Sequence, residues 1–417
     1  MNYLRTKLKY GLTSSDAGSW GEDPSGEADF LVLRSTEIGL DGEIRMGATA
    51  SRHLTASEHR RTKLLDGDLL VVRSSGSDAH LGKVGYVDHN SEGCSFSNFI
   101  QRLRVADHLS SRFAWYFLNS FDAKQQIRIL SSTTTGLQNL SASTIGELQI
   151  PIPGLAEQRR IVDFLDAETA RMDRAGEAMR RQIDVLAERR LQALDTVWPA
   201  DPDAPMKRLG YGTRLVTSGS RGWADFVGDS GSIFFRSANL RRDSLSPNLT
   251  SLAYVRLPPS VTVEASRSRI RGGDVLVGIT GANTGWVALA DDSLKGGNVS
   301  QHVCLVRPAR GEIHGRWLAY LISSPTIQTG LMGSQYGGTK TQLSLPDIRD
   351  LRVPVLPIAS QKDVAAEMDG TLEILDRQRE LRNQQLRVLA ERRQALITAA
   401  VTGQIDVSTA SGRGIED

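Results

Sequence analysis

The segment Val185-Leu186-Ala187-Glu188-Arg189-Arg190 returns unchanged as Val388-Leu389-Ala390-Glu391-Arg392-Arg393, 203 residues further along the chain. The same offset relates further pairs of identical residues: Pro151 and Pro354, Gln158 and Gln361, Asp166 and Asp369, and Asp173 and Asp376. Because this period is far longer than a solenoid repeat, each copy is the size of a domain. The sequence therefore predicts one unit written twice, in which a globular stretch is followed by a long helix.

The composition is that of a soluble globular protein with room for roughly two or three domains. Of the 417 residues, 40% are hydrophobic and 24% are charged, and the cysteines number two, Cys94 and Cys304. The chain has no apolar run of membrane-spanning length, its first residues lack a signal-peptide core, and two cysteines make no disulfide framework. We expect a cytoplasmic protein that does not enter a membrane.

The charge is unevenly divided between the two copies. Residues 205–352 carry 18 basic and 10 acidic side chains, a net charge of +8, whereas residues 1–150 carry 16 and 17, a net charge of −1. A basic excess favours a polyanionic partner such as nucleic acid. The near-neutral first copy weakens this inference if both copies do the same work.

The globular part of each copy has short apolar runs that end at Gly, Asn, Asp or Ser, which is typical of strands. Proline-containing connectors, Ile150-Pro151-Ile152-Pro153 and Val353-Pro354-Val355-Leu356-Pro357, close both parts because proline disfavours helix in the residue before it. We expect a globular domain over 1–150, a connector and helix over 151–200, a second domain over 201–352, a second connector and helix over 353–405, and a flexible tail over 406–417.

Two proline-free stretches, from about Ala156 to Val197 and from about Ser360 to Val401, have heptad spacing of apolar residues. The first seam contains Leu165, Met172, Met179 and Leu186, and the second contains Met368, Leu375, Leu389 and Leu396, with Arg382 between them. In a chain ordered domain, helix, domain, helix, two such helices can pair antiparallel. The predicted fold is α+β, with two similar strand-rich domains separated by an antiparallel coiled coil of two long helices and a pseudo-twofold internal repeat.

The sequence offers little catalytic chemistry. Gly228-Asp229-Ser230-Gly231 matches the nucleophile segment of trypsin-like proteases, but the first copy lacks an equivalent, so a polar turn is the better interpretation. In residues 333–341 Thr339 separates Gly338 from Lys340, which breaks the spacing of a P-loop. The histidines do not fall at metal-ligand spacing. We expect a non-catalytic protein that needs no cofactor and no metal.

Polar loops occur instead at matching places in both copies. Ser and Thr hydroxyls and backbone amides suit phosphate oxygens, whereas Arg, Asn and Gln can pair with base edges. Ordinary turn chemistry is the alternative for any single loop, but three loop pairs in register favour a shared binding surface. The candidate DNA-binding residues are Arg34, Ser35, Arg73, Ser74, Ser75, Thr134, Thr135, Gln138 and Asn139 in the first copy, and Arg221, Arg236, Ser237, Asn239, Thr280, Asn283, Gly338, Thr339, Lys340, Thr341 and Gln342 in the second.

Several motifs together resemble the specificity subunits of type I restriction-modification systems. The likeness is carried by the connector and helix start at 151–162, by Gly67-Asp68-Leu69-Leu70, and by the distal residues 389–397 with Thr402-Gly403. The resemblance implies two target recognition domains that bind a bipartite site in double-stranded DNA, and helices that hold them about one duplex turn, roughly 34 Å, apart.

The resemblance also implies protein partners: two adenine-methyltransferase subunits that dock on the helices, and restriction and translocase subunits that join this core. The implied docking residues are Glu157, Gln158, Arg189, Arg190, Gln361, Arg392 and Arg393. One departure is that Ser360 stands where the first copy has Glu157, which puts the distal partner contact in doubt.

Two other functions fit the same repeat. One is a helical scaffold whose domains bind proteins, and the other is a free-standing bipartite DNA-binding protein. Salt-dependent binding to duplex DNA distinguishes the scaffold from the other two, and co-purification with a methyltransferase distinguishes the specificity subunit from the free-standing protein.

Overall fold

A computed structural model describes residues 3–26, 29–75, 80–131, 138–333 and 342–407. The chain forms two compact units: unit 1 contains residues 1–179 and 384–417, and unit 2 contains residues 180–383. Across the described ranges, no helix combines the length and apolar character needed to cross a membrane. Over the same ranges, no three His, Cys, Asp or Glu side chains gather as metal ligands.

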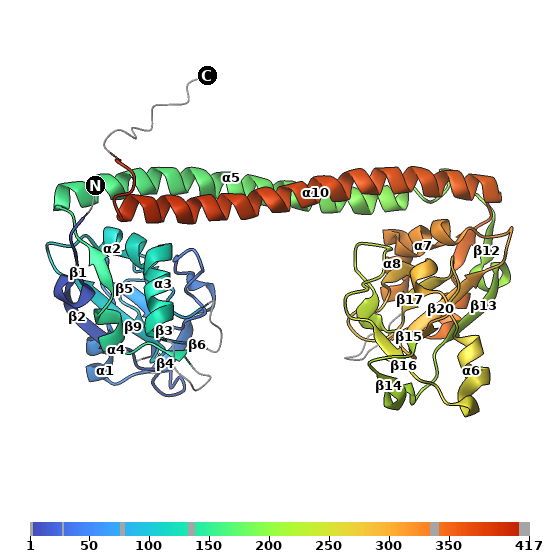
Figure 1. Cartoon of the computed structure of the whole chain (residues 1–417), viewed down its shortest axis with the longest axis horizontal. Coiled ribbons are helices and arrows are strands. Elements are labelled where there is room, and N and C mark those ends of the chain that lie inside the picture. The colour runs from blue at the N-terminus through green and yellow to red at the C-terminus, as the bar shows by residue number, and fades with distance from the viewer. Residues whose placement is uncertain (1–2, 27–28, 76–79, 132–137, 334–341, 408–417) are drawn as a thin grey trace, which may run out of the picture. The chain divides into compact units, whose positions relative to one another are not determined.

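The globular part of unit 1, here called domain 1, is built on an antiparallel four-stranded sheet in the order β2-β9-β5-β7 and a three-stranded sheet in the order β4-β3-β8 (Figure 1). The strand β1 pairs with β11, so the domain begins and ends at one place. Its elements are β1 (Arg5–Lys7), η1 (Leu8–Gly11), β2 (Leu12–Ala17), β3 (Asp29–Leu33), η2 (Met46–Ala48), β4 (Ala50–His53), α1 (Ala56–Thr62), β5 (Leu69–Val72), β6 (Ser74–Ser75), β7 (Val84–Tyr86), β8 (Ser95–Phe96), β9 (Ile100–Val105), α2 (Ser111–Leu118), α3 (Phe121–Leu130), β10 (Gln138–Asn139), α4 (Ala142–Gly146) and β11 (Gln149–Pro151).

The globular part of unit 2, domain 2, has sheets in the orders β13-β20-β17-β18 and β14-β16-β15-β19, and β12 pairs with β21. Its elements are β12 (Met206–Arg208), η3 (Leu209–Gly212), β13 (Thr213–Ser218), η4 (Trp223–Phe226), β14 (Val227–Gly228), β15 (Ser232–Phe235), η5 (Ser237–Asn239), β16 (Ala253–Val255), η6 (Pro259–Val261), α6 (Thr262–Arg267), β17 (Val275–Gly278), β18 (Val287–Leu289), η7 (Asp292–Leu294), β19 (Asn298–Val299), β20 (Val303–Pro308), α7 (Gly315–Ser323), α8 (Pro325–Gly333), α9 (Leu345–Arg349) and β21 (Arg352–Pro354). The order of elements and the pairing of the main sheet repeat those of domain 1, so the predicted internal repeat is confirmed.

The central strands β5 and β17 are buried along their whole length, which explains why their sequences are continuous apolar runs. Each is preceded by a glycine with positive φ, 83° at Gly67 and 85° at Gly273. The aspartate after this glycine, Asp68 or Asp274, is buried and forms an ion pair with Arg104 or Arg307 of the neighbouring strand. The Gly-Asp pair therefore fixes the entry of both central strands.

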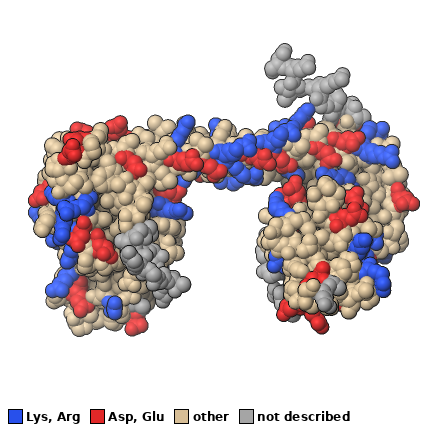
Figure 2. Space-filling model, turned by 180° about the vertical axis from the view of Figure 1, so that it is seen from behind, with Lys and Arg blue, Asp and Glu red and all other residues tan. Residues whose placement is uncertain are grey.

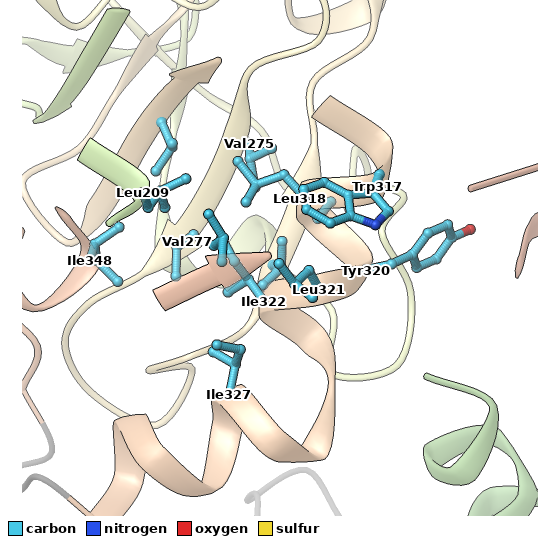
Figure 3. Packing of buried hydrophobic residues seen from close by; sticks show 14 of the residues in the cluster. Leu209, Val275, Val277, Trp317, Leu318, Tyr320, Leu321, Ile322, Ile327 and Ile348 are labelled. Carbon is cyan, nitrogen blue, oxygen red and sulfur yellow. The ribbon is translucent and has the colours of Figure 1, made fainter. Parts of the chain in front are cut away.

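In domain 2 the helix α7 packs on the main sheet. Figure 3 shows Leu318 and Leu321 of α7 beside Val275 and Val277 of β17, while the phenol of Tyr320 points away from this cluster. The corresponding helix of domain 1, α2, is likewise buried along most of its length. These helices lie at the end of each domain that meets the long helices (Figure 1).

The long helices are α5 (Leu155–Asp195) and α10 (Ile358–Val401). In unit 1 the start of α5, with Ile161 and Leu165, packs against the end of α10, with Ile397 and Val401. In unit 2 the end of α5, with Leu194, packs against the start of α10, with Met368 and Leu372. Both pairings run antiparallel, which confirms the predicted coiled coil.

A hydrogen-bonded triad fastens each domain to the helix that follows it. In unit 1 the Tyr116 hydroxyl donates to Asp166 at 2.5 Å, and Arg112 forms an ion pair with the same carboxylate at 2.9 Å. Burial and the hydrogen bond to Asp166 raise the pKa of Tyr116. Tyr320, Asp369 and Arg316 make the same triad in unit 2.

The C-terminal part of unit 1 is packed further than the sequence suggests. The sequence predicts a tail from residue 406, yet Val407 is buried in the core of unit 1 together with residues of α10. The ordered structure therefore extends past the predicted start of the tail.

Candidate DNA interface

In domain 1 the structure brings together two of the three predicted polar loops: the loop that contains Ser74 and Ser75, and the loop that contains Gln138 and Asn139. The short strands β6 and β10 pair antiparallel, with Ser74 opposite Asn139 and Ser75 opposite Gln138. The amide of Leu140 also donates to the carbonyl of Arg73 at 2.7 Å. The loop that follows β5 and the loop that precedes α4 therefore form one surface.

Domain 2 has the same junction. Thr280 and Gln342 form an antiparallel bridge, and the amide of Leu343 donates to the carbonyl of Ile279 at 2.8 Å. The side chain of Gln342 is exposed and that of Thr280 is half-buried.

The remaining predicted loop, which follows β3 in domain 1 and β15 in domain 2, is tied to this junction by different side chains in the two domains. In domain 1 the Lys83 ammonium donates to the carbonyls of Ser35 at 3.2 Å and Ile38 at 2.5 Å, and burial lowers the pKa of Lys83. In domain 2 the Asn283 amide donates to the carbonyl of Ser237 at 2.8 Å. Both domains thus hold three loops together, although the residues that connect them differ.

Within the loop after β15, one prediction needs correction. Asn239 is fully buried, and its side chain accepts from the amide of Arg236 and donates to the carbonyls of Asn248 and Ser251. A side chain with all these internal partners shapes the loop and is closed to DNA. In domain 1 the buried Glu37 takes the same place and accepts from the amide of Arg34 at 2.6 Å.

The two arginines of these loops are also engaged with their own domains. Arg34 pairs with Glu37 and donates to the carbonyl of Ala48, and Arg236 donates to the carbonyl of Ser251. The Arg34 side chain is 40% exposed, so part of its guanidinium still faces solvent. Both arginines have a structural role that the sequence pattern did not indicate.

Some candidates lie outside the described residues: Thr134, Thr135, Gly338, Thr339, Lys340 and Thr341. Of Ser75 and Gln138 only the backbone is described. Among the others, Asn139 and Arg221 are exposed, whereas Arg73, Ser74 and Asn283 are half-buried.

A fourth loop, which was not predicted from the sequence, joins this surface in both domains. In domain 1 it precedes β9, and the carbonyl of Phe99 accepts from the amide of Arg73 at 2.9 Å. In domain 2 it precedes β20, and the carbonyl of His302 accepts from the amide of Ile279 at 3.0 Å. Residues 98 and 99 match 301 and 302 at the offset of 203, so the repeat itself could have pointed to this loop.

The side chains of the fourth loop are well suited to contacts with bases. Phe99 is 52% exposed and Asn98 is exposed beside it. In domain 2 the His302 ring lies between Thr280, 2.5 Å from its Nδ1, and Gln301, 3.1 Å from its Nε2. An exposed aromatic ring can contact a thymine methyl group, whereas amides and imidazole can hydrogen-bond base edges.

The candidate partner-docking residues divide into buried and exposed positions. Gln158 is fully buried, where it accepts from the amide of Ser110 at 2.7 Å and donates to the carbonyls of His108 and Pro153. Gln361 makes the same set of bonds in unit 2. The prediction that these glutamines contact a partner is corrected: they join the start of each helix to its domain.

Two of the arginines also face inward. Arg190 pairs with Asp376, and Arg393 pairs with Asp173, each at 3.4 Å between the helices. Arg189 and Arg392, by contrast, are exposed. Of these four arginines, Arg189 and Arg392 are therefore the ones left to a partner.

At the start of α5, Glu157 accepts from the hydroxyl of Tyr3 at 3.2 Å and pairs with Arg160. Burial and the negative charge of Glu157 raise the pKa of Tyr3 to about 12. In unit 2 Ser360 stands at the position of Glu157, so this position carries a hydroxyl in place of a carboxylate.

Charged side chains of both signs are mixed along the long helices. On the face drawn in Figure 2, Lys and Arg side chains are mixed with Asp and Glu side chains along the long helices. Such a mixed surface suits a protein partner more than a DNA backbone, which favours a continuous basic strip.

Comparison with known proteins gives consistent matches. A family model described as the type I restriction modification DNA specificity domain matches residues 39–174. The specificity subunit of the type I restriction enzyme StySPI from Salmonella potsdam is 31% identical over 132 residues, 32% of this chain and 28% of that protein. The specificity subunit of EcoBI from Escherichia coli is 22% identical over 324 residues, 72% of this chain and 66% of that protein. The chain thus aligns with less than two thirds of the length of each of these relatives.

Solved structures share the fold. A chain from a study of complex assembly and conformational transition in the type I restriction-modification system has a TM-score of 0.76 at 17% identity, with 97% of this chain and 98% of that chain covered. The HsdS subunit from Thermoanaerobacter tengcongensis has a TM-score of 0.54 at 18% identity, with 97% of each chain covered. At such identities the likeness concerns the fold alone.

Proposed function

Because the chain belongs to the family of type I restriction-modification specificity subunits, we propose that it is the non-catalytic subunit that selects the DNA sequence for such a complex. Domain 1 reads one half of a bipartite site in double-stranded DNA, and domain 2 reads the other half. The residues between the two half-sites form a spacer that is not read.

The observation that carries this proposal is a repeated scaffold with different side chains on the same loops. Ser74 and Asn139 of domain 1 correspond to Thr280 and Gln342 of domain 2, and both pairs lie at the same loop junction. Phe99 likewise corresponds to His302. One scaffold with two sets of contacting groups is what reading two different half-sites requires.

The chemistry of methylation belongs to partner subunits under this proposal. An adenine within a duplex must leave the base stack before it can be methylated, and unstacking requires an enzyme pocket. Two methyltransferase subunits dock on the long helices, and Glu157, Arg189 and Arg392 remain proposed contacts. Restriction and translocase subunits join through the methyltransferases.

Substitution of the loop junction in one domain tests the proposal. Thr280→Ala with Gln342→Ala removes a hydroxyl and an amide from domain 2, and the chain is co-expressed with the methyltransferase subunit of its system. Mapping of methylated adenines across the genome is expected to show relaxed recognition in one half-site only, with about 1–3 kcal/mol lost per base contact.

The matched variant is Ser74→Ala with Asn139→Ala in domain 1, which is expected to relax the opposite half-site and to leave the first unchanged. An equal loss of methylation at all sequences in both variants would contradict base reading, since it would mean that these residues contact only phosphates. Methylation that does not depend on the chain would refute the function as a whole.

A further inference from the structure

Unit 2 contains a cavity of about 820 Å³ between its domain and the long helices. Its walls come from α5 and α10, the loop after η5, the loop between β17 and β18, and the helices α7 and α8. All of its lining residues lie between positions 187 and 379, so the cavity belongs to one compact unit. Pockets that bind small molecules have volumes of this order and combine apolar walls with a few converging polar groups.

The corresponding place in unit 1 is closed by two side chains. Trp115 donates from its Nε1 to the carbonyl of Val84 at 2.9 Å. The Asn119 amide donates to the same carbonyl at 2.9 Å and accepts from the amide of Val84 at 3.4 Å. Val84 belongs to β7, the edge strand of the main sheet, so these two side chains cap a strand edge.

The second copy has neither of these side chains. Ala319 and Ser323 of α7 stand where α2 and its C-terminal end have Trp115 and Asn119. The Ser323 hydroxyl donates instead to the carbonyl of Ala319 in its own helix, at 2.8 Å. Val287 of β18, the counterpart of Val84, is buried and lines the cavity.

The backbone of Val287 offers a donor and an acceptor on the open edge of β18. Successive residues of this strand turn alternately toward β17 and away from it. The carbonyl of Trp286 accepts from Gly278 of β17, whereas the amide of Leu289 donates to the carbonyl of Leu245 on the other side. Val287 turns the same way as Leu289, and among the described residues its amide and carbonyl have no hydrogen-bond partner. Because unpaired buried backbone groups cost free energy, a group from outside the chain is expected to pair with them.

The charged side chains of the lining are mainly basic. They are Arg190, Arg242 and Arg379, with Asp243 as the acidic member. Arg190 pairs with Asp376 and Arg379 pairs with Asp243. Arg242 is exposed and has no hydrogen bond or ion pair in the part of the chain that the structure describes. The guanidinium of Arg242 is therefore free to hold an anionic group such as a phosphate.

The remaining lining suits a flat ring. Trp286 is half-buried at the cavity wall, and Leu191, Leu194 and Leu245 add apolar surface. Aromatic side chains stack on heterocyclic rings, and apolar walls exclude water from the ring faces.

We propose that this cavity binds a free nucleotide, that is, a heterocyclic ring joined to a phosphate. The ring packs against Trp286 and the leucines, its hydrogen-bonding edge pairs with the backbone of Val287, and Arg242 holds the phosphate. The base-pairing edge of a nucleobase has a donor beside an acceptor, which matches the amide and carbonyl of a single strand residue. The inference goes beyond the proposed function and does not depend on it.

Titration of the full chain with nucleotides tests this inference. The monophosphates of adenosine, guanosine, cytidine and uridine are titrated separately by isothermal titration calorimetry, beside the matching nucleosides and ribose phosphate. At least one monophosphate is expected to bind about tenfold more tightly than its nucleoside and than ribose phosphate, because each of these lacks one recognised group. Hydrogen exchange in a peptide that contains Val287 is expected to slow when this monophosphate binds.

Ser323→Asn transfers to unit 2 the side chain that closes the edge in unit 1. The new amide is expected to bond to the backbone of Val287, as Asn119 bonds to Val84, and to weaken binding of the monophosphate at least about tenfold. Circular dichroism and thermal unfolding verify that the variant remains folded.

Arg242→Gln changes an exposed position and tests the phosphate contact without disturbing the core. It is expected to weaken binding of the monophosphate about tenfold and to leave binding of the nucleoside unchanged. Arg241→Gln is the matched control, since Arg241 is exposed and lies outside the cavity lining, and it is expected to keep full affinity.

The possible results are distinct. Failure of all the monophosphates to bind would overturn the inference and leave the proposed function untouched, because methylation mapping measures that function. Equal affinities of the unchanged chain and the Ser323→Asn variant would overturn the assignment of the ligand to this cavity. Equal binding of ribose phosphate and the monophosphate would show that only the anion is recognised, which would overturn the nucleotide as the ligand.

Discussion

At the scale of single residues, identity between the two copies has two physical causes. One is internal, as for Gln158 and Gln361, which each satisfy three backbone groups where a helix leaves its domain. The other is external, as proposed for Arg189 and Arg392, whose side chains face solvent. Burial distinguishes the two causes, and the sequence alone cannot supply it.

Gln158→Leu is expected to destabilise unit 1 by about 2–4 kcal/mol, because it leaves the Ser110 amide and two carbonyls without partners. The free energy of unfolding is measured by urea denaturation, and hydrogen exchange at the Ser110 amide reports the local loss. Gln182→Leu, an exposed position of the same helix, serves as the control, with an expected change below about 0.5 kcal/mol. Equal effects of the two substitutions would contradict the structural role of Gln158.

At the scale of elements, an ion pair joins a long helix to a domain loop in unit 2. Arg379 of α10 forms an ion pair with Asp243, which lies in the loop after η5. Burial favours a higher pKa for Asp243, but the hydrogen bond and charge of Arg379 outweigh it and hold that pKa below its ordinary value. A carboxylate with a lowered pKa stabilises the fold above its ordinary pKa, and this contribution is lost as the pH falls through the lowered value.

Arg379→Met is therefore expected to raise the pKa of Asp243, since burial remains while the donor is gone. Acid unfolding of unit 2 should then begin at a higher pH. Carbon-13 NMR titration of the Asp243 carboxyl measures the first effect, and circular dichroism against pH measures the second. Arg377→Met, at an exposed position of α10, should change neither quantity. An unshifted titration in the Arg379 variant would disprove the contact.

The elements themselves could largely be predicted from the sequence, whereas parts of the interface could not. The apolar run of β17 and the heptads of α5 depend on local periodicity, which can be recognised in a single sequence. The burial of Asn239 depends on loop carbonyls brought together by the fold, so its polar side chain was wrongly assigned to DNA. Phe99 and His302 were missed because their loop is short and its place beside Arg73 and Ile279 arises only from strand pairing.

At the scale of the whole molecule, α5 and α10 each continue without a break from one compact unit into the other. Under the proposed function, these helices determine the length of the DNA spacer. Seven residues complete almost two turns of helix, so an insertion of this size nearly preserves the phase of the apolar seam.

Insertion of seven residues after Met179 in α5 and after Asn383 in α10 is expected to lengthen the spacer and leave both half-sites unchanged. The insertion adds about 10 Å of helix, which corresponds to about 3 base pairs of DNA. Mapping of methylated adenines measures the new spacer. Altered half-sites with an unaltered spacer would show that the helices do not set the distance.

The division of the chain also orders its synthesis. Unit 2 is one uninterrupted stretch, so its core is complete as soon as residue 383 has emerged from the ribosome. Unit 1 must wait, because Ile397, Val401 and Val407 belong to its core while its other residues emerged some two hundred positions earlier. In the interval Ile161 and Leu165 lack the part of α10 that packs against them in the complete chain, so the core of unit 1 closes last.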